Sequence, residues 1–288
     1  MRVQNNGSLV VDIEGGSCDV VGDISGSPVC ATPPDTQFMP DPLAGVPEPA
    51  MPSVVAPAPV SLDTPAKIVP MECPNSGKPQ ATTIASPATC TFGSSLGGTW
   101  RLYPGLYPGG LSFQAGTFYL EPGIYWIGGG GIQTNANGAT LISVPTGLTR
   151  FCATPQEACG IMVFNSFLPD NSDPQADGAD VVLNGGSASI KLHPVDHPVY
   201  GGIVFFQDRD LNPQPELHLN GGDSDMEVRG TVYSPKGRVR VEGNAAALTL
   251  DQIIANSFNV TGRSSGAQIT ALASNDFIYR LNAAGLVE

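Results

Sequence analysis

The sequence predicts an all-β fold, and three observations carry this prediction. Only 14% of the 288 residues are charged, whereas the chain contains 35 glycines and 27 prolines. From about Trp100 onward, short apolar runs alternate with Gly, Asn, Asp or Pro turns. Such a composition is typical of strands joined by turns rather than of helices. The length and the 41% of hydrophobic residues allow one large core.

A repeat of about 22 residues refines this class to a right-handed parallel β-helix, which is a β-solenoid. Taking one apolar anchor from each repeat gives Leu111, Ile132, Ile161, Val181, Ile203, Met226, Leu248 and Ile269. The one long step, from Ile132 to Ile161, contains Cys152 and Cys159, so a disulfide-closed insertion would account for it. The competing all-β architecture is an antiparallel sandwich or jelly roll.

Three regions follow one another along the chain. Residues 1–30 contain two short apolar runs, which we expect to be strands that belong to the solenoid. Residues 31–99 form a Pro-rich extended segment with a disulfide loop, and the prolines exclude a helix. Apolar residues such as Leu43 and Val46 indicate that this segment crosses a surface and lies against it. Residues 100–288 form the main β-solenoid.

Six cysteines indicate an oxidising compartment. They lie as three couples of sequence neighbours without zinc-ligand spacing, so we expect three disulfides, each closing a short loop. Free buried thiols are the alternative. The disulfide candidates are Cys18, Cys30, Cys73, Cys90, Cys152 and Cys159. No signal peptide or apolar run of membrane-spanning length is visible, so we expect a processed or truncated chain, which leaves room for a membrane anchor in a precursor.

The net charge of −13 excludes nucleic acid as an expected partner and leaves calcium as the one cofactor that the sequence suggests. Two loops concentrate the oxygen ligands that hard cations need, although ordinary Asx turns would use the same residues. The candidate calcium ligands are Asn171, Asp173, Asp177 and Asp180 in one loop and Asn220, Asp223 and Asp225 in the other.

The densest mixed cluster of charge is Asp208-Arg209-Asp210, directly after the apolar run 203–206. One repeat later lies Arg229, so stacked coils would place it near Asp208 as a structural ion pair. Catalysis by these residues is the alternative, but the motifs of polygalacturonases do not occur. Eight aromatic residues between 100 and 126 offer either core packing or an exposed strip that could stack on sugar rings.

Four segments resemble the C-terminal region of TadG-like proteins, which belong to the Tad, or Flp, pilus-assembly systems of bacteria. They are DPLAGVPEP (41–49), the two elements YPGLYPGGLSF and GTFYLEPGIYWIGGGGI (103–132), YGGIVFFQDRD (200–210) and VRGTVYSP (228–235). Their order is that of the family, and they span nearly the whole chain. The resemblance implies a β-helical region outside the membrane, and it supplies no catalytic residues.

The sequence therefore predicts a non-catalytic, extracellular structural or adhesive module of a Tad-type pilus or bacterial cell surface. Self-association, including end-to-end assembly into a filament, and contact with other pilus components are the expected interactions. A β-helix carbohydrate-active enzyme or glycan-binding module is the alternative, with a glycan as its partner.

Overall fold

The computed structural model describes residues 2–4, 9–13, 28–29, 41–63, 72–75, 78–81, 83–84, 87–93, 98–135, 138–151, 159–168, 179–185, 189–221, 226–243, 247–262 and 268–271. Within these ranges the chain is all-β and contains no helix. A helix long and apolar enough to cross a membrane is accordingly not found in this described part.

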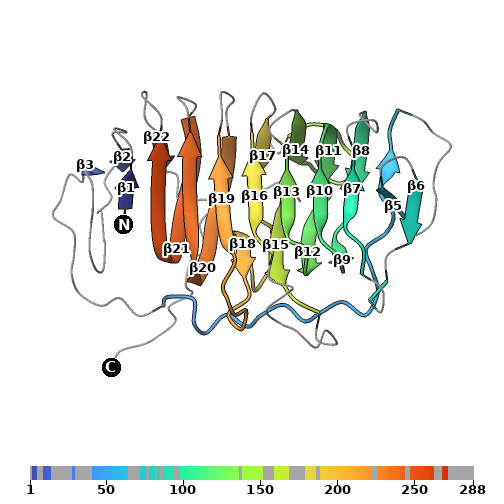
Figure 1. Ribbon diagram of the computed structural model, residues 1–288, viewed down its shortest axis with the longest axis horizontal. Helices are drawn as coiled ribbons and strands as arrows, with labels where there is room; N and C mark the ends of the chain where they lie inside the picture. The colour runs from blue at the N-terminus through green and yellow to red at the C-terminus, as the bar shows by residue number, and fades with distance from the viewer. Residues whose placement is uncertain are drawn as a thin grey trace.

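Three rows of parallel strands build the sheet (Figure 1), and each strand pairs with the strand of its row in the next repeat. Row A contains β7 (Cys90–Phe92), β10 (Leu111–Phe113), β13 (Ile132–Thr134), β16 (Val181–Asn184) and β19 (Glu216–Asn220). Row B contains β8 (Thr99–Leu102), β11 (Gly116–Leu120), β14 (Ala139–Ser143) and β17 (Ile190–Leu192). Row C contains β9 (Gly105–Tyr107), β12 (Gly123–Gly128), β15 (Ile161–Ser166) and β18 (Ile203–Gln207). The long strands β20 (Met226–Gly243) and β21 (Ala247–Gly262) pass through rows B, C and A in turn.

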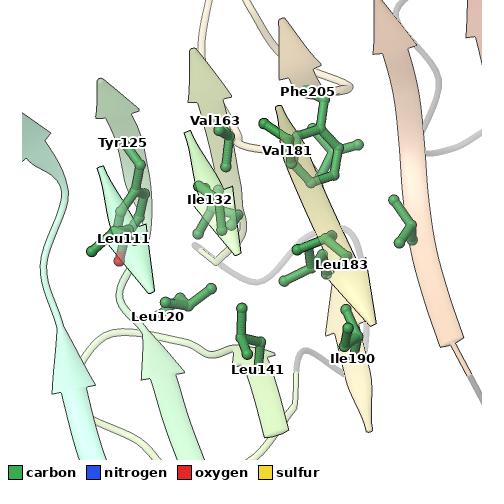
Figure 2. Close-up of a cluster of buried hydrophobic side chains, with 14 of the residues drawn as sticks. Leu111, Leu120, Tyr125, Ile132, Leu141, Val163, Val181, Leu183, Ile190 and Phe205 are labelled. Atoms are coloured by element: carbon green, nitrogen blue, oxygen red, sulfur yellow. The ribbon is translucent and has the colours of Figure 1, made fainter. Parts of the chain in front are cut away.

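The sheet curls so that the three rows share one core. Leu111 of row A pairs with Ile132, and Phe118 of row B pairs with Leu141, so like residues stack from repeat to repeat. Because side chains alternate along a strand, every second residue points inward. Figure 2 shows such side chains from all three rows pointing toward one another. Each fully buried Leu, Ile or Phe contributes about 1.5–3 kcal/mol, so this core is the main source of stability.

Strands from both ends of the chain complete one end of the sheet. There, β1 (Arg2–Gln4) pairs with residues 259–261 of β21, and β2 (Leu9–Ile13) pairs with both β22 (Gln268–Ala271) and β3 (Pro28–Val29). A separate antiparallel pair, β5 (Glu72–Asn75) and β6 (Lys78–Ala81), lies at the opposite end (Figure 1). The chain therefore travels the length of the sheet between β3 and β5.

Residues 41–56, called the strap from here on, make this crossing along row C. The blue trace in Figure 1 runs beneath the strands, and it ends in β4 (Val60–Ser61), which pairs antiparallel with β8 and makes the sheet mixed. Leu43 and Val46 of the strap are 2% and 5% exposed. The Pro-rich segment thus lies against the sheet where its apolar residues indicated, while the exact domain limits remain predictions.

Row C is covered on both sides, which explains the apolar runs 161–164 and 203–206 within it. All six residues of β15 and all five of β18 are buried. Their inward side chains join the main core, and their outward side chains form a second cluster with Leu43 and Val46. A strand covered on both faces needs no polar alternation. The strap is therefore the layer that buries the outer face of row C.

Glycine permits a close approach of successive repeats at the turn between rows C and A. Gly131 has a φ of +60°, and a Cβ there would lie 2.2 Å from the carbonyl oxygen of Asp180. Gly110, one repeat earlier, has a φ of +79° and would place a Cβ 2.4 Å from the carbonyl oxygen of Gly131. Only glycine combines a positive φ with this lack of space.

The predicted anchors are correct in part. Leu111 pairs with Ile132, and Leu248 pairs with both Met226 and Ile269. The central steps are wrong, because Ile132 pairs with Val181. The anchor chosen between them, Ile161, belongs to row C, as does Ile203. The connections between strands are long here, so the repeat is longer than 22 residues. Anchors chosen at a constant spacing therefore fall in different rows.

Candidate functional site

The charged turn after β18 is the point at which the strap is fixed to the sheet. Residues 208–210 follow a buried strand, and the strap passes beside them. Because three carboxylates and an arginine from two distant segments, 41–49 and 200–210, meet here, this junction is the candidate functional site. We call it the strap junction.

Arg209 holds the strap through its guanidinium group. Nη2 donates to the carbonyl oxygen of Leu43 at 2.8 Å, and Nη1 donates to that of Val46 at 3.0 Å. The guanidinium carbon also lies 5.0 Å from the ring centre of Phe206 and 5.1 Å from that of Tyr233. These rings fix the planar group, which is suited to several hydrogen bonds at once. Arg209 therefore binds the main chain of the strap rather than one of its side chains.

Tyr233 links the same arginine to the start of the strap. Its hydroxyl group accepts from Nε of Arg209 at 2.9 Å and donates to Oδ2 of Asp41 at 2.6 Å. Burial is the main cause that raises the pKa of Tyr233, and the bond to Asp41 raises it further, while Arg209 opposes both. The phenol consequently stays neutral and keeps its proton for Asp41. Farther along the strap, Nε1 of Trp126 donates to the carbonyl oxygen of Pro49 at 3.2 Å.

Three carboxylates gather at the junction. One oxygen from each of Glu48, Asp208 and Asp210 lies within 4.8 Å of the others. Asp208 is 5% exposed, receives a hydrogen bond from Oγ of Ser166 and accepts the backbone N–H of Asp210 at 2.7 Å. Glu48 accepts the backbone N–H of Arg209 at 2.8 Å. Carboxylate oxygens so placed can share a proton or supply part of the oxygen shell of a hard cation.

The pKa of Glu48 is raised, and burial is the largest cause. The backbone hydrogen bond from Arg209 lowers it, and the negative charge of Asp208 raises it again. Arg209 thus lies beside three carboxylates, but its guanidinium group donates mainly to carbonyl oxygens of the strap. The side chain of Lys236 adds a second positive charge nearby, because its Nζ donates to the carbonyl oxygen of Arg209 at 2.8 Å.

Two of the four predicted ion-pair residues form ion pairs, but with partners that the sequence did not indicate. Arg209 lies 3.7 Å from Glu48, and Nε of Arg229 lies 2.9 Å from Oδ2 of Asp251. The expected pair between Asp208 and Arg229 is wrong. In this repeat Ile203 pairs with Thr231, so the register places Arg229 before the start of β18, far from the turn that follows it. Asp208 instead accepts hydrogen bonds from Oγ of Ser166 and from the backbone N–H of Asp210.

The two predicted calcium loops fall mostly outside the described residues. Asn171, Asp173, Asp177, Asp223 and Asp225 lie there. Asp180 is exposed and accepts the backbone N–H of Glu216 through Oδ1 at 2.7 Å. Asn220 pairs in register with Asn184 and Glu242 inside the sheet. Calcium binding by these loops remains a prediction.

Two of the six cysteines have side chains in the described part of the chain. Cys90 and Cys159 are 1% and 5% exposed, and neither is a free thiol. The side chains of Cys18, Cys30, Cys73 and Cys152 fall outside the described residues. The nearest-neighbour disulfide map therefore remains a prediction.

The early aromatic residues serve mainly as core. Phe92, Phe113 and Phe118 pack together, with ring centres 4.6–5.3 Å apart. Tyr125 and Trp126 point to opposite sides of row C as expected, yet they are 1% and 4% exposed because the main core covers one and the strap covers the other. An exposed strip made of these side chains for binding sugars is not formed.

Comparison of the chain with family models, curated proteins and solved structures finds no match. Sequence reasoning identified Asp208, Arg209 and Asp210 of the strap junction and missed Asp41, Glu48 and Tyr233. The only sequence signal for these three residues was that they lie in the segments 41–49 and 228–235, which were singled out above for their resemblance to TadG-like proteins.

Proposed function

We propose that this chain is a non-catalytic, extracellular structural or adhesive module of a Tad-type pilus or bacterial cell surface. Its sheet forms a right-handed parallel β-helix, which presents a long acidic surface and assembles end to end or with other surface components. Parallel, in-register pairing of each row around a common core supports the β-helix. The right hand follows because crossover connections between parallel strands are right-handed in about 98% of cases.

One observation carries the structural role. The most highly charged of the family-like elements, 200–210, is used to hold another family-like element, the strap, to the sheet. Its arginine binds two main-chain carbonyl oxygens and a tyrosine, and its buried aspartate binds a serine and the turn itself. Residues engaged in this way have their hydrogen-bonding capacity directed at the scaffold. This supports a rigid module in which the resembling elements maintain shape.

Composition supports the extracellular location. The six cysteines suit an oxidising compartment, and the net charge of −13 keeps a long exposed surface soluble. A sheet with a continuous core and a covered outer row also gives proteases few flexible sites to cut. These properties fit a protein displayed outside the cell.

Electron microscopy of the purified native chain tests this function, with and without calcium and with and without reductant. Ordered filaments, or particles bound to purified pili, are the expected result. Single particles in every condition, together with no binding to pili or cells, would argue against an assembly or adhesion role. Comparing the two redox conditions shows whether disulfides are needed for the form observed.

A second function, a carbohydrate-active enzyme, is favoured by the three carboxylates at the strap junction. A glycosidase needs one carboxylic acid with a raised pKa beside a second, ionised carboxylate. Glu48 has the raised pKa, and a carboxylate oxygen of Asp208 lies within 4.8 Å of one of its own. Reducing-sugar release from a panel of polysaccharides, compared between the native chain and Glu48→Gln, tests it. Activity that this substitution abolishes would replace the structural function as the primary one.

A further inference from the structure

Three polar side chains lie buried on the inner face of row C, near the ends of its strands. Asn165 of β15 and Gln207 of β18 pair in register. Ser234 follows the residue of β20 that pairs with Phe206, so it lies beside Gln207. Asn165, Gln207 and Ser234, called the polar column from here on, are 2%, 5% and 1% exposed. Bulk solvent therefore does not solvate them, and each of their polar atoms needs a partner inside the protein.

The hydrogen bonds of the polar column leave two of its oxygen atoms unpaired. Nδ2 of Asn165 donates to Oε1 of Gln207 and to the carbonyl oxygen of Ala179, both at 3.1 Å. Nε2 of Gln207 donates to the carbonyl oxygen of Asn165 at 3.4 Å. Oδ1 of Asn165 and Oγ of Ser234 make no hydrogen bond within the described part of the chain. Buried polar atoms of native proteins are paired with the protein or with ordered water.

Both of these residues line one small cavity between rows C and A. Val163 and Phe205 of row C and Val181 and Leu217 of row A form part of its wall. The cavity gives the centre of a water molecule about 10 Å³ of space. One buried water molecule needs about this much space, and it also needs two or more polar partners. The cavity offers both.

An adjacent cavity in the main core differs in the polarity of its wall. Val163 and Phe205 border it as well, and it gives the centre of a water molecule about 20 Å³. Leu111, Leu141 and Leu183, whose side chains point toward one another in Figure 2, belong to its apolar lining. The hydroxyl group of the lining residue Tyr125 already donates to main-chain carbonyl oxygens. Apolar cavities stay dry, so polarity rather than size separates the two.

We propose that the polar cavity is a binding site for ordered water, which supplies the hydrogen bonds that Oδ1 of Asn165 and Oγ of Ser234 do not find in the protein. A water molecule suits both atoms, because it can donate to the carbonyl oxygen of the amide and can donate to or accept from the hydroxyl group. The larger apolar cavity beside it takes no water.

The water site lies directly behind the strap junction. Gln207 precedes Asp208 in the chain, and Ser234 follows Tyr233. Because side chains alternate along a strand, Tyr233 points outward to Arg209 while Ser234 points inward to the cavity. Water bound here connects the ends of successive strands of row C at the place where the strap is held. It is therefore a structural part of the support of the strap junction.

Water-selective NMR of the isotope-labelled native chain tests the proposal without any substitution. Magnetisation is transferred from water to the side-chain N–H protons of Asn165 and Gln207. Measurement in the rotating frame separates cross-relaxation with bound water from proton exchange, because the two have opposite signs. We expect cross-relaxation with long-lived water at both side chains. We expect none at the methyl groups of Leu111 and Leu183, which line the apolar cavity.

Two outcomes would overturn the proposal. Loss of all cross-relaxation with water at Asn165 and Gln207 would show that the polar cavity is dry. Equal transfer to the methyl groups of Leu111 and Leu183 would show that water enters the whole core, so that the polar column would have no special role.

Ser234→Val gives a second reading, because its two methyl groups fill the cavity and offer water no hydrogen bond. Transfer from water to the side-chain N–H protons of Gln207 should disappear in this variant. Ser257→Val is the matched control, since Ser257 is an exposed residue of β21 that pairs in register with Arg238, and the transfer should remain as in the native chain. Transfer that persists in Ser234→Val would place the water elsewhere and overturn the proposal. The native chain decides the question if Ser234→Val does not fold.

The water site goes beyond the proposed function and does not depend on it. It lies inside the sheet, so it is expected in single particles and in filaments alike, and magic-angle spinning extends the same measurement to filaments. Single particles without binding to pili or cells would count against the proposed function and leave the water site in place. A dry polar cavity in a chain that forms filaments would do the reverse.

Discussion

Replacing Arg209 with alanine should release the strap, and the size of the effect follows from its contacts. The substitution removes two hydrogen bonds from a charged group to carbonyl oxygens, one to Tyr233, and the contacts with two aromatic rings. A hydrogen bond to a charged group contributes about 1.5–3 kcal/mol and a partly exposed cation–π contact about 0.5–1 kcal/mol. The side chain is 19% exposed, so water replaces part of this network. We expect a loss of about 3 kcal/mol.

Two measurements check this expectation. Thermal unfolding should shift downward by roughly 6–12 °C, because 1 kcal/mol corresponds to about 2–4 °C in a chain of this size class. Limited proteolysis should show faster cleavage within residues 41–56, since the strap loses its attachment while the core of the sheet is retained. Arg209→Lys should recover only part of the loss, because an ammonium group cannot reach both carbonyl oxygens in the geometry of a guanidinium group.

Arg238→Ala is the matched control for the loss of an arginine. Its side chain is 56% exposed and forms a surface ion pair with Glu216, so its removal should change stability by less than about 1 kcal/mol. If Arg209→Ala melts within the range of this control and its strap is cut no faster, the contacts of Arg209 do not hold the strap. The account of the strap junction given above would then be wrong.

Three further results are expected. Gly131→Ala should destabilise the protein by at least about 2 kcal/mol in chemical denaturation, because its Cβ would meet a carbonyl oxygen at a positive φ. The control Gly45→Ala, whose Cβ would have nothing within 4 Å, should change the stability by less than about 0.5 kcal/mol. Equal effects of the two substitutions would contradict the close approach at Gly131. Because the pKa of Glu48 is raised in the folded state, stability should fall as the pH rises from 4.5 through the folded pKa, and Glu48→Gln should remove this slope and be slightly more stable at pH 7 but equal at pH 4. A Glu48→Gln protein with an unchanged pH slope of stability would show that another group causes it. Reductant should lower the free energy of unfolding by about 2–4 kcal/mol for each disulfide. The disulfide connectivity can be determined from the peptides of a non-reducing digest, and pairs other than sequence neighbours would reject the predicted connectivity.

Much of the fold is visible in the sequence because it depends on local patterns. Runs such as 203–206 and the glycines at 128–131 indicate strands and tight turns, and an apolar period near 22 residues indicates stacking. The same reasoning failed in the middle of the chain, where Ile132 pairs with Val181. A fixed period cannot describe connections of unequal length, so the row to which a strand belongs was assigned wrongly there.

The candidate site was predictable only in part. Asp208-Arg209-Asp210 is conspicuous because few charges occur in the chain, but its partners lie in the strap and in β20. Glu48 is an ordinary acid within a Pro-rich segment until the strap brings it within 4.8 Å of two aspartates. No local pattern encodes a contact between residues 161 positions apart.

The sequence by itself determined that this protein is all-β, that its strands repeat and that the Pro-rich segment crosses an apolar surface. The tertiary structure alone decided which strands pair, which side of row C the strap covers and which carboxylates meet Arg209. The physical reason is that alternation, turn formation and charge are properties of neighbouring residues, whereas register and ion-pair partners depend on how long connections bring distant segments together.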